Sequence, residues 1–289
     1  MKRIMTIQDI SCIGKCSLTV ALPIISAFGV ETAIVPTAIL STHTQFQGFT
    51  FRDLTDDLEP IKEHWKKEGF EFSAIYSGYL GSERQIEIVR DYVRTFRGKD
   101  TFTIVDPVMA DNGKLYAGFD DHFPEKMAGL CREADVILPN LSEAALMLGV
   151  PYPGEDASPE VTKELLMGLT KFCSGAVVIT GVTLEDGTFG FMGFDGKTGT
   201  HFEYGNPKVP FKSHGTGDIF ASTFTGALAK GFTVLDALKL AADYVTACIR
   251  NTYEDQNRVN YAVNFEEELP WLMERITSNR SINNPAERR

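Results

Sequence analysis

Short apolar runs alternate with longer segments of helical periodicity along most of the chain. Six of the short runs predict strands, and several of these are β-branched and apolar throughout, as are strands that are covered on both faces of a sheet. These predicted strands comprise residues 3–8, 32–38, 74–77, 102–106, 136–138 and 176–180. The predicted helices comprise residues 53–67, 83–96, 159–172, 217–230 and 234–251. This alternation indicates β-α-β units and therefore an α/β fold with three layers, in which helices cover both faces of a mostly parallel central sheet.

The predicted sheet has an antiparallel edge. Residues 188–194 and 200–204 flank the turn sequence 195–199, which contains two glycines, and together they predict a hairpin. No repeat or low-complexity linker interrupts the pattern, so we predict one domain over residues 1–277. Residues 278–289 are polar and contain Pro285, and we expect them to form a frayed tail.

Composition excludes several classes of protein. The 289 residues carry 28 Lys and Arg against 39 Asp and Glu, a net charge of −11, which argues against a nucleic-acid partner. No stretch approaches the ~20 apolar residues that span a bilayer, and the first residues lack the apolar region of a signal peptide, so we expect no membrane association and a cytoplasmic location. The five cysteines are odd in number and scattered, which indicates reduced thiols rather than disulfides or a zinc site.

Polar residues and glycines follow the predicted strands. In open parallel sheets, ligands bind beyond the carboxyl ends of the strands, so these residues are expected to share one crevice. They are Asp9, residues 41–47, residues 78–82, Asp106, Asn140 with Glu143, and Thr180.

The most specific motif is His214-Gly215-Thr216-Gly217-Asp218, which precedes a predicted helix. The two glycines allow a tight turn that exposes backbone N–H groups, and the helix adds the positive end of its dipole, so the segment predicts an anion hole that suits a phosphate. Asp218 beside such a hole suits a base that takes a proton from an attacking hydroxyl. The alternative is that Asp218 is only the N-cap of the helix.

Two common phosphate-binding fingerprints are absent. Gly196-Lys197-Thr198 nearly completes a P-loop, but Phe191 stands where its first glycine is required. The dinucleotide pattern also fails, because Phe220 replaces its third glycine. A Walker-type ATPase and a standard dinucleotide oxidoreductase are therefore disfavoured.

Six sequence blocks occur in an order that resembles the vitamin kinases of the ribokinase superfamily, and most of all the pyridoxal/pyridoxamine kinases. The blocks are residues 7–8, 43–45, 77–82 and 106–109, Asn140 with Pro139 and Glu143, and residues 215–218, and the resemblance extends over residues 3–275. It implies a ribokinase-like fold and the ATP-dependent phosphorylation of the 5′-hydroxymethyl group of pyridoxal, pyridoxamine or pyridoxine. It also implies use of Mg²⁺ and a homodimer, and it leaves open whether a monovalent cation assists.

The resemblance assigns roles to individual residues. Asp218 matches the catalytic base, and Gly215, Thr216 and Gly217 match the hole for the transferring phosphoryl group. Asp106 and Glu143 match carboxylates that hold Mg²⁺ through water. The positions that match ATP contacts are Asp106, Asn140, Glu143, Thr180, Asn206, Pro207, Lys208 and Val209. The positions that match contacts to the substrate are Asp9, His43, Thr44, Gln45 and Asp218.

Some residues depart from the family or allow a second interpretation. Thr180 stands where relatives often have lysine. Asp9 stands where pyridoxal kinases commonly have serine and hydroxymethylpyrimidine kinases commonly have aspartate, so a hydroxymethylpyrimidine kinase is the same-fold alternative. Asp9 is also explained by a turn whose own amides satisfy it, and His43 by local hydrogen bonding.

Two broader alternatives remain at the level of the sequence. Residues 111–118 are compatible with a mobile loop that covers the site or with an ordinary surface turn. A non-catalytic regulator that binds a vitamin or a nucleotide is the alternative from another functional class, since a fold alone does not confer activity.

Overall fold

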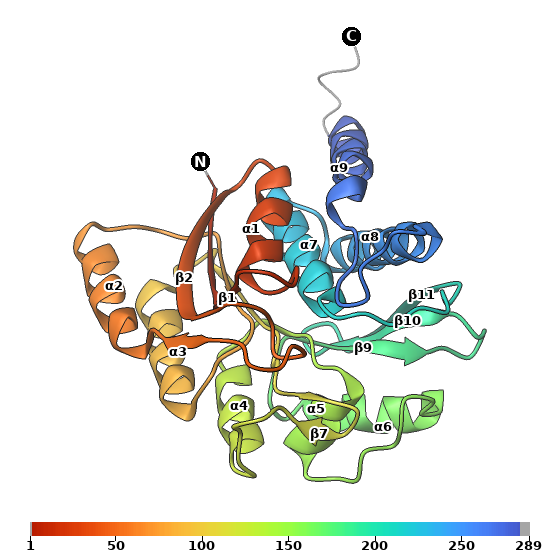
Figure 1. The fold of residues 1–289 in the computed structure, drawn as a ribbon, viewed down its shortest axis with the longest axis horizontal. Helices are drawn as coiled ribbons and strands as arrows, with labels where there is room; N and C mark the ends of the chain where they lie inside the picture. The colour runs from red at the N-terminus through yellow and green to blue at the C-terminus, as the bar shows by residue number, and fades with distance from the viewer. Residues whose placement is uncertain (1, 284–289) are drawn as a thin grey trace.

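The protein is built on one nine-stranded sheet, as the computed structural model of residues 2–283 shows (Figure 1). The strands lie in the order β11-β10-β9-β8-β5-β4-β1-β2-β3. The six from β9 to β2 are parallel to one another, whereas β3 pairs antiparallel with β2, and β10 pairs antiparallel with both β9 and β11. The strands are β1 (Arg3–Ser11), β2 (Glu31–Leu40), β3 (Phe51–Asp53), β4 (Ala74–Ser77), β5 (Phe102–Val105), β8 (Val136–Ile137), β9 (Ala176–Thr183), β10 (Phe189–Asp195) and β11 (Thr200–Asn206).

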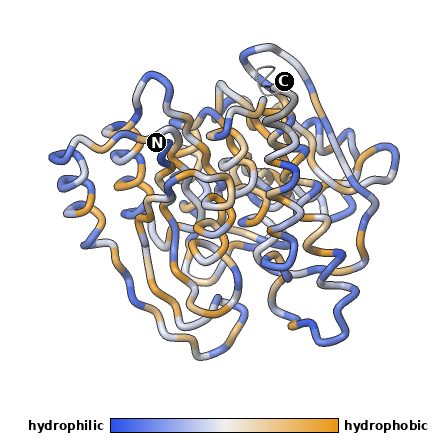
Figure 2. The backbone as a smooth tube through the Cα atoms, turned by 90° about the horizontal axis from the view of Figure 1, so that it is seen from above, coloured by the Kyte–Doolittle hydropathy of each residue, from blue (hydrophilic) through white to orange (hydrophobic). Residues whose placement is uncertain are grey.

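Helices cover both faces of this sheet, which confirms the predicted three-layer fold (Figure 1). One face packs against α2 (Thr55–Lys67), α3 (Glu83–Phe96), α4 (Phe123–Cys131), α5 (Leu141–Leu148) and α6 (Pro159–Leu169). The other packs against α1 (Leu18–Ala27), α7 (Thr216–Lys230), α8 (Val234–Glu254) and α9 (Leu269–Asn283). Each interface forms its own apolar core. Figure 2 shows that hydrophobic residues concentrate in the interior and hydrophilic residues on the outside. Burial of apolar surface in these two cores is the main force that holds the layers together.

All six predicted strands and the edge hairpin are present, but several elements were missed. Helix α1 contains Pro23 and is apolar on most of its surface, so it lacks the amphipathic periodicity that marks an exposed helix. Helix α5 is short and almost wholly buried, so it too shows no amphipathic pattern. Asp53 was assigned to a helix, yet it ends strand β3, and α2 begins at Thr55. The pairing of β3 with β2 is a long-range contact that local sequence does not reveal.

The end of the chain also differs from the prediction. Helix α9 continues through Ser278 to Asn283, so the first part of the predicted frayed tail is helical, and residues 284–289 lie outside the described residues. None of the helices within residues 2–283 is both long and apolar enough to cross a membrane.

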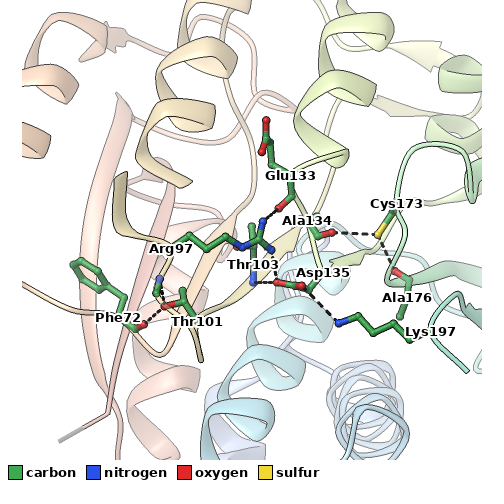
Figure 3. A network of polar contacts seen from close by, with 11 residues as sticks. Phe72, Arg97, Thr101, Thr103, Glu133, Ala134, Asp135, Cys173, Ala176 and Lys197 are labelled. Carbon is green, nitrogen blue, oxygen red and sulfur yellow. Dashed lines mark hydrogen bonds and ion pairs between the residues drawn. The ribbon is translucent and has the colours of Figure 1, made fainter. Parts of the chain in front are cut away.

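A polar network joins the starts of β5, β8 and β9 (Figure 3). Arg97 donates to the carboxylate of Asp135 at 2.6 Å and to the backbone carbonyl of Glu133 at 2.8 Å. The same carboxylate accepts from the backbone N–H of Thr103 at 2.9 Å, and Lys197 lies 3.9 Å from its other oxygen. These contacts lie near the amino ends of the strands, whereas the predicted site residues follow their carboxyl ends.

Candidate active site

Three carboxylates from distant parts of the sequence meet at the carboxyl end of the sheet. Asp106 directly follows β5, Glu143 lies in the first turn of α5, and Asp218 lies in the first turn of α7. Burial raises the pKa of Asp106, and the nearby charges of Glu143 and Asp218 raise it further. Among the described residues, no Lys, Arg or His forms an ion pair with these three side chains. The centre is therefore suited to a cationic ligand.

The loop before α7 has the geometry expected of an anion hole. Gly215 is the N-cap of the helix with φ 81°, a left-handed conformation that favours glycine. A β-carbon on Gly215 would lie 2.3 Å from the carbonyl oxygen of Lys15, so close packing also requires glycine here. Thr216 and Gly217 begin the helix, and their backbone amides lie at its positive end.

Asp218 is inside the first turn of α7, because Gly215 occupies the N-cap position. The N-cap interpretation of Asp218 is therefore wrong. Burial raises the pKa of Asp218 to about 7. A backbone hydrogen bond from Ser17 opposes this rise, and the charge of Asp9 adds to it. A carboxyl group with this pKa exchanges its proton near neutral pH, which is what a general base requires.

Asn140 and Glu143 form a capping box at the start of α5. The side chain of Asn140 accepts from the backbone N–H of Glu143 at 2.9 Å, and Glu143 accepts from the backbone N–H of Asn140 at 2.8 Å. Glu143 also accepts from the backbone N–H of Met109 at 3.2 Å, and Asn140 donates to the carbonyl of Ala110 at 3.0 Å. Burial raises the pKa of Glu143 in spite of these bonds. Both residues thus hold the segment that follows Asp106 in place.

The carboxylate centre suits a magnesium ion that is held partly through water and substrate phosphates. Within the described part of the chain, no group of three or more His, Cys, Asp or Glu side chains is placed to hold a metal on its own. Mg²⁺ commonly keeps several waters and binds one or two carboxylates together with substrate phosphates. Both oxygens of Glu143 already accept backbone hydrogen bonds, so contact through water suits this residue better than direct coordination.

Asp9 lies in β1 beside the anion hole and is buried. Its two carboxylate oxygens accept from the hydroxyl groups of Ser11 at 2.9 Å and Ser17 at 2.5 Å. Burial raises the pKa of Asp9, and the two serine hydrogen bonds partly oppose that shift. Two side-chain hydroxyls therefore satisfy the Asp9 carboxylate, whereas the alternative interpretation attributed this to backbone amides of its own turn.

His43 is buried, and both of its ring nitrogens are engaged by the protein. Nδ1 accepts from the backbone N–H of Gln45 at 3.2 Å, and Nε2 lies 3.1 Å from the carbonyl of Tyr261. The ring also lies 5.4 Å from that of His214, measured between centroids. These contacts favour the local hydrogen-bonding interpretation of His43, in which the ring orders the loop that presents Thr44 and Gln45.

The remaining predicted residues are Thr44, Gln45, Thr180 and the segment 206–209. Thr44 and Gln45 are exposed, and Thr180 forms a bridge with Asn140. The side chain of Asn206 donates to Asp243 of α8 at 3.0 Å. Pro207 and Lys208 are exposed and Val209 is half-buried, and Lys208 lies 5.1 Å from the ring centroid of Phe189. The segment 206–209 therefore packs on β10 and α8, and within residues 2–283 no hydrogen bond, ion pair or ring contact joins it to the three carboxylates.

Four residues at the site were not individually singled out from the sequence. Tyr116 lies in the loop after β7 (Lys114–Leu115). Burial raises the pKa of its phenol, and the nearby charges of Glu143, Asp218 and Asp106 raise it further. Burial raises the pKa of Tyr79 and of Cys16 to about 12 in each case, and the charge of Asp9 contributes to both shifts.

The fourth is Ser17, which contacts Asp9 and Asp218. No local pattern distinguishes Ser17 or Cys16 from ordinary residues before a helix. Tyr116 and Tyr79, by contrast, lie inside segments that the sequence had already marked.

Comparison with known proteins agrees with this geometry. The profile of the family described as phosphomethylpyrimidine kinase matches residues 22–263. A provisionally named phosphomethylpyrimidine kinase from Bacteroides thetaiotaomicron, crystallised with pyridoxal, is 38% identical with a TM-score of 0.87, covering 94% of this chain and 95% of that one. Pyridoxal kinase from Lactobacillus plantarum is 29% identical with a TM-score of 0.86, covering 98% of this chain and 99% of that one.

A curated relative points to the second substrate class. Hydroxymethylpyrimidine/phosphomethylpyrimidine kinase from Rhizobium meliloti is 29% identical over 242 residues, which cover 82% of this chain and 86% of the relative. The fold and the family match define a ribokinase-like kinase. The chain belongs to the phosphomethylpyrimidine kinase family, whose members and structural neighbours include both pyridoxal kinases and hydroxymethylpyrimidine kinases.

Proposed function

We propose that this protein transfers the γ-phosphoryl group of ATP to the 5′-hydroxymethyl group of pyridoxal, pyridoxamine or pyridoxine. The observation that carries the proposal is the position of Asp218. A carboxyl group whose pKa is raised to about 7 stands in the first turn of α7, directly after the glycine-built N-terminus of that helix. A proton acceptor and a phosphate-binding element are thus adjacent, as transfer to a hydroxyl requires.

In the proposed reaction, Asp218 accepts the proton of the acceptor hydroxyl as the hydroxyl oxygen attacks the γ-phosphorus of ATP, and the bond from that phosphorus to the β–γ bridging oxygen breaks, so that ADP leaves. The backbone amides of Gly215, Thr216 and Gly217 donate hydrogen bonds to the phosphoryl oxygens, where negative charge concentrates during transfer. Asp106 and Glu143 would hold Mg²⁺ through water, and that ion would neutralise charge on the ATP phosphates. Asn140 keeps Glu143 and the segment after Asp106 in register through the capping box.

Two observations bear on the acceptor. The solved structure from Bacteroides thetaiotaomicron, 38% identical to this chain, was obtained with pyridoxal, which supports a vitamin B6 acceptor. Asp9 supports the second candidate, hydroxymethylpyrimidine, because a buried carboxylate suits an amino substituent on a ring. The same carboxylate also suits a protonated pyridine nitrogen, so Asp9 is compatible with both.

An acceptor panel tests the proposal. Purified protein with ATP and Mg²⁺ is given pyridoxal, pyridoxamine, pyridoxine or hydroxymethylpyrimidine, and phosphorylated product is measured directly. We expect the highest kcat/KM with a vitamin B6 compound. A clear preference for hydroxymethylpyrimidine would assign the second candidate, and ADP release without any phosphorylated acceptor would refute both. The proposal also includes a homodimer and a cytoplasmic location, which sedimentation and fractionation would test.

A further inference from the structure

Ser17 precedes α1 but does not act as an ordinary N-cap. A serine at this position normally has extended backbone and accepts a hydrogen bond from an amide of the first turn. Ser82 before α3 and Ser158 before α6 do this in the same chain. Ser17 instead has φ 52° and ψ −133°, and its side chain makes no capping bond. This is the conformation of the first central residue of a type II′ turn, which favours glycine.

The hydroxyl group and the backbone N–H of Ser17 point to two different carboxylates. Oγ donates to Oδ1 of Asp9 at 2.5 Å, and the backbone N–H donates to Asp218. One residue therefore bridges the carboxylate proposed to contact the substrate ring and the carboxylate proposed to take the proton. The two side chains belong to β1 and α7, which are more than 200 positions apart in sequence.

The surrounding contacts hold Ser17 in this unfavourable conformation. Its carbonyl accepts from the amides of Val20 and Ala21 at 3.0 and 2.9 Å, which fixes it to α1. On the other side, Lys15 has φ 50° and presents its carbonyl to Gly215 of the anion hole. Strained backbone of this kind persists only where the structure around it over-determines the conformation, and it concentrates at functional sites.

We propose that Ser17 is a positioning residue for phosphoryl transfer, which fixes the Asp9 carboxylate relative to Asp218 so that the acceptor hydroxyl meets the base. This inference rests on the proposed function. Ser17 need not touch either substrate, because it acts through the two carboxylates that it bridges. Because its hydroxyl donates to Asp9, Ser17 neither caps α1 nor adopts the extended backbone of an ordinary N-cap serine.

Two substitutions separate positioning from stability. Ser17→Ala removes the hydroxyl and keeps the unfavourable φ, whereas Ser17→Gly removes the hydroxyl and relieves the strain. Both should lower kcat by about 5- to 50-fold, since small misplacements of reacting groups cost up to about 10²-fold in rate. Ser17→Gly should nevertheless unfold at a higher temperature than Ser17→Ala. Thr233→Ala is the matched control, because the hydroxyl of Thr233 caps α8 far from the site; it should lower the Tm and leave kcat unchanged.

The acceptor in these assays is the one that the wild-type protein phosphorylates best. A kcat of Ser17→Gly within twofold of wild type would overturn the positioning role, as would a kcat that follows Tm across the three variants. Adding Ser17→Ala to Asp9→Ala should lower kcat by less than twofold further, because the bridge is already lost; multiplied losses would show that Ser17 acts elsewhere. An active wild type with unaffected Ser17 variants refutes this inference alone, whereas a wild type that phosphorylates no acceptor refutes the proposed function and the positioning role with it.

Discussion

The ring of Tyr152 lies directly against the backbone of Gly113, at the tip of the small hairpin formed by β6 (Ala110–Asp111) and β7. A β-carbon on Gly113 would come within 2.6 Å of Cδ1 of that ring, and the backbone N–H of Gly113 donates to Oγ of Ser142 at 2.9 Å. The hairpin leads to Tyr116, which lies among the carboxylates. Residues 111–118, which the sequence suggested as a covering loop, therefore contact both α5 and the segment that follows it.

Gly113→Ala should displace this hairpin and lower kcat by about 10-fold, because the new methyl group collides with Tyr152 while the left-handed φ adds strain. Steady-state assays check the rate. Gly187→Ala has a similar φ of 80° with open space around it, so this control should keep wild-type kcat. Tyr152→Ala should restore part of the loss when combined with Gly113→Ala; an unchanged double variant would contradict the collision.

Asp218→Asn should lower kcat by about 10²–10⁴-fold, the usual contribution of a general base. Binding of ATP should persist, because the anion hole consists of backbone amides that the substitution leaves in place. Product formation measures the first effect and calorimetric titration with ATP the second. A variant that turns over at close to the wild-type rate would remove Asp218 from the mechanism.

The reaction rate should rise with pH across neutrality. Asp218 is active as a base only when deprotonated, and its pKa is raised to about 7, so acid inactivates it in a range where an ordinary aspartate stays charged. A profile of kcat against pH checks this, with thermal unfolding at each pH to show that the protein stays folded. A flat profile from about pH 5 to about pH 9 would mean that no group with this pKa controls the step.

Stability of the ligand-free protein should fall as pH rises. The pKa of Glu143 is raised from 4.5 to about 8, so within that interval the folded chain holds a proton that the unfolded chain has released. The free energy of unfolding therefore decreases with increasing pH through this window. Glu143→Gln should make the fall of Tm with pH shallower, and Glu267→Gln, at an exposed position, should not. Parallel Tm curves for wild type and Glu143→Gln would contradict the raised pKa.

The sequence predicted the fold well because most of its signals are local. Buried parallel strands leave continuous apolar runs, and exposed helices leave an amphipathic pattern that needs no knowledge of the neighbours. Helices α1 and α5 leave neither signal, since α1 is apolar along most of its length and contains Pro23, and α5 is short and almost wholly buried. The rule that the carboxyl ends of parallel strands share one edge placed Asp106 and Glu143 together, whereas Asp218 was identified separately, from the glycine motif that begins α7.

The sequence by itself determined the three-layer fold, the edge of the sheet that carries the site and the carboxylates that stand there. Only the tertiary structure decided how those carboxylates are held. It turned the hydroxyl of Ser17 from its own helix toward Asp9, engaged both nitrogens of His43 within the protein, and placed Tyr116 beside the buried acids. The physical reason is that the direction of a side chain and the pKa of a buried group depend on neighbours brought together by folding, which no local stretch of sequence contains.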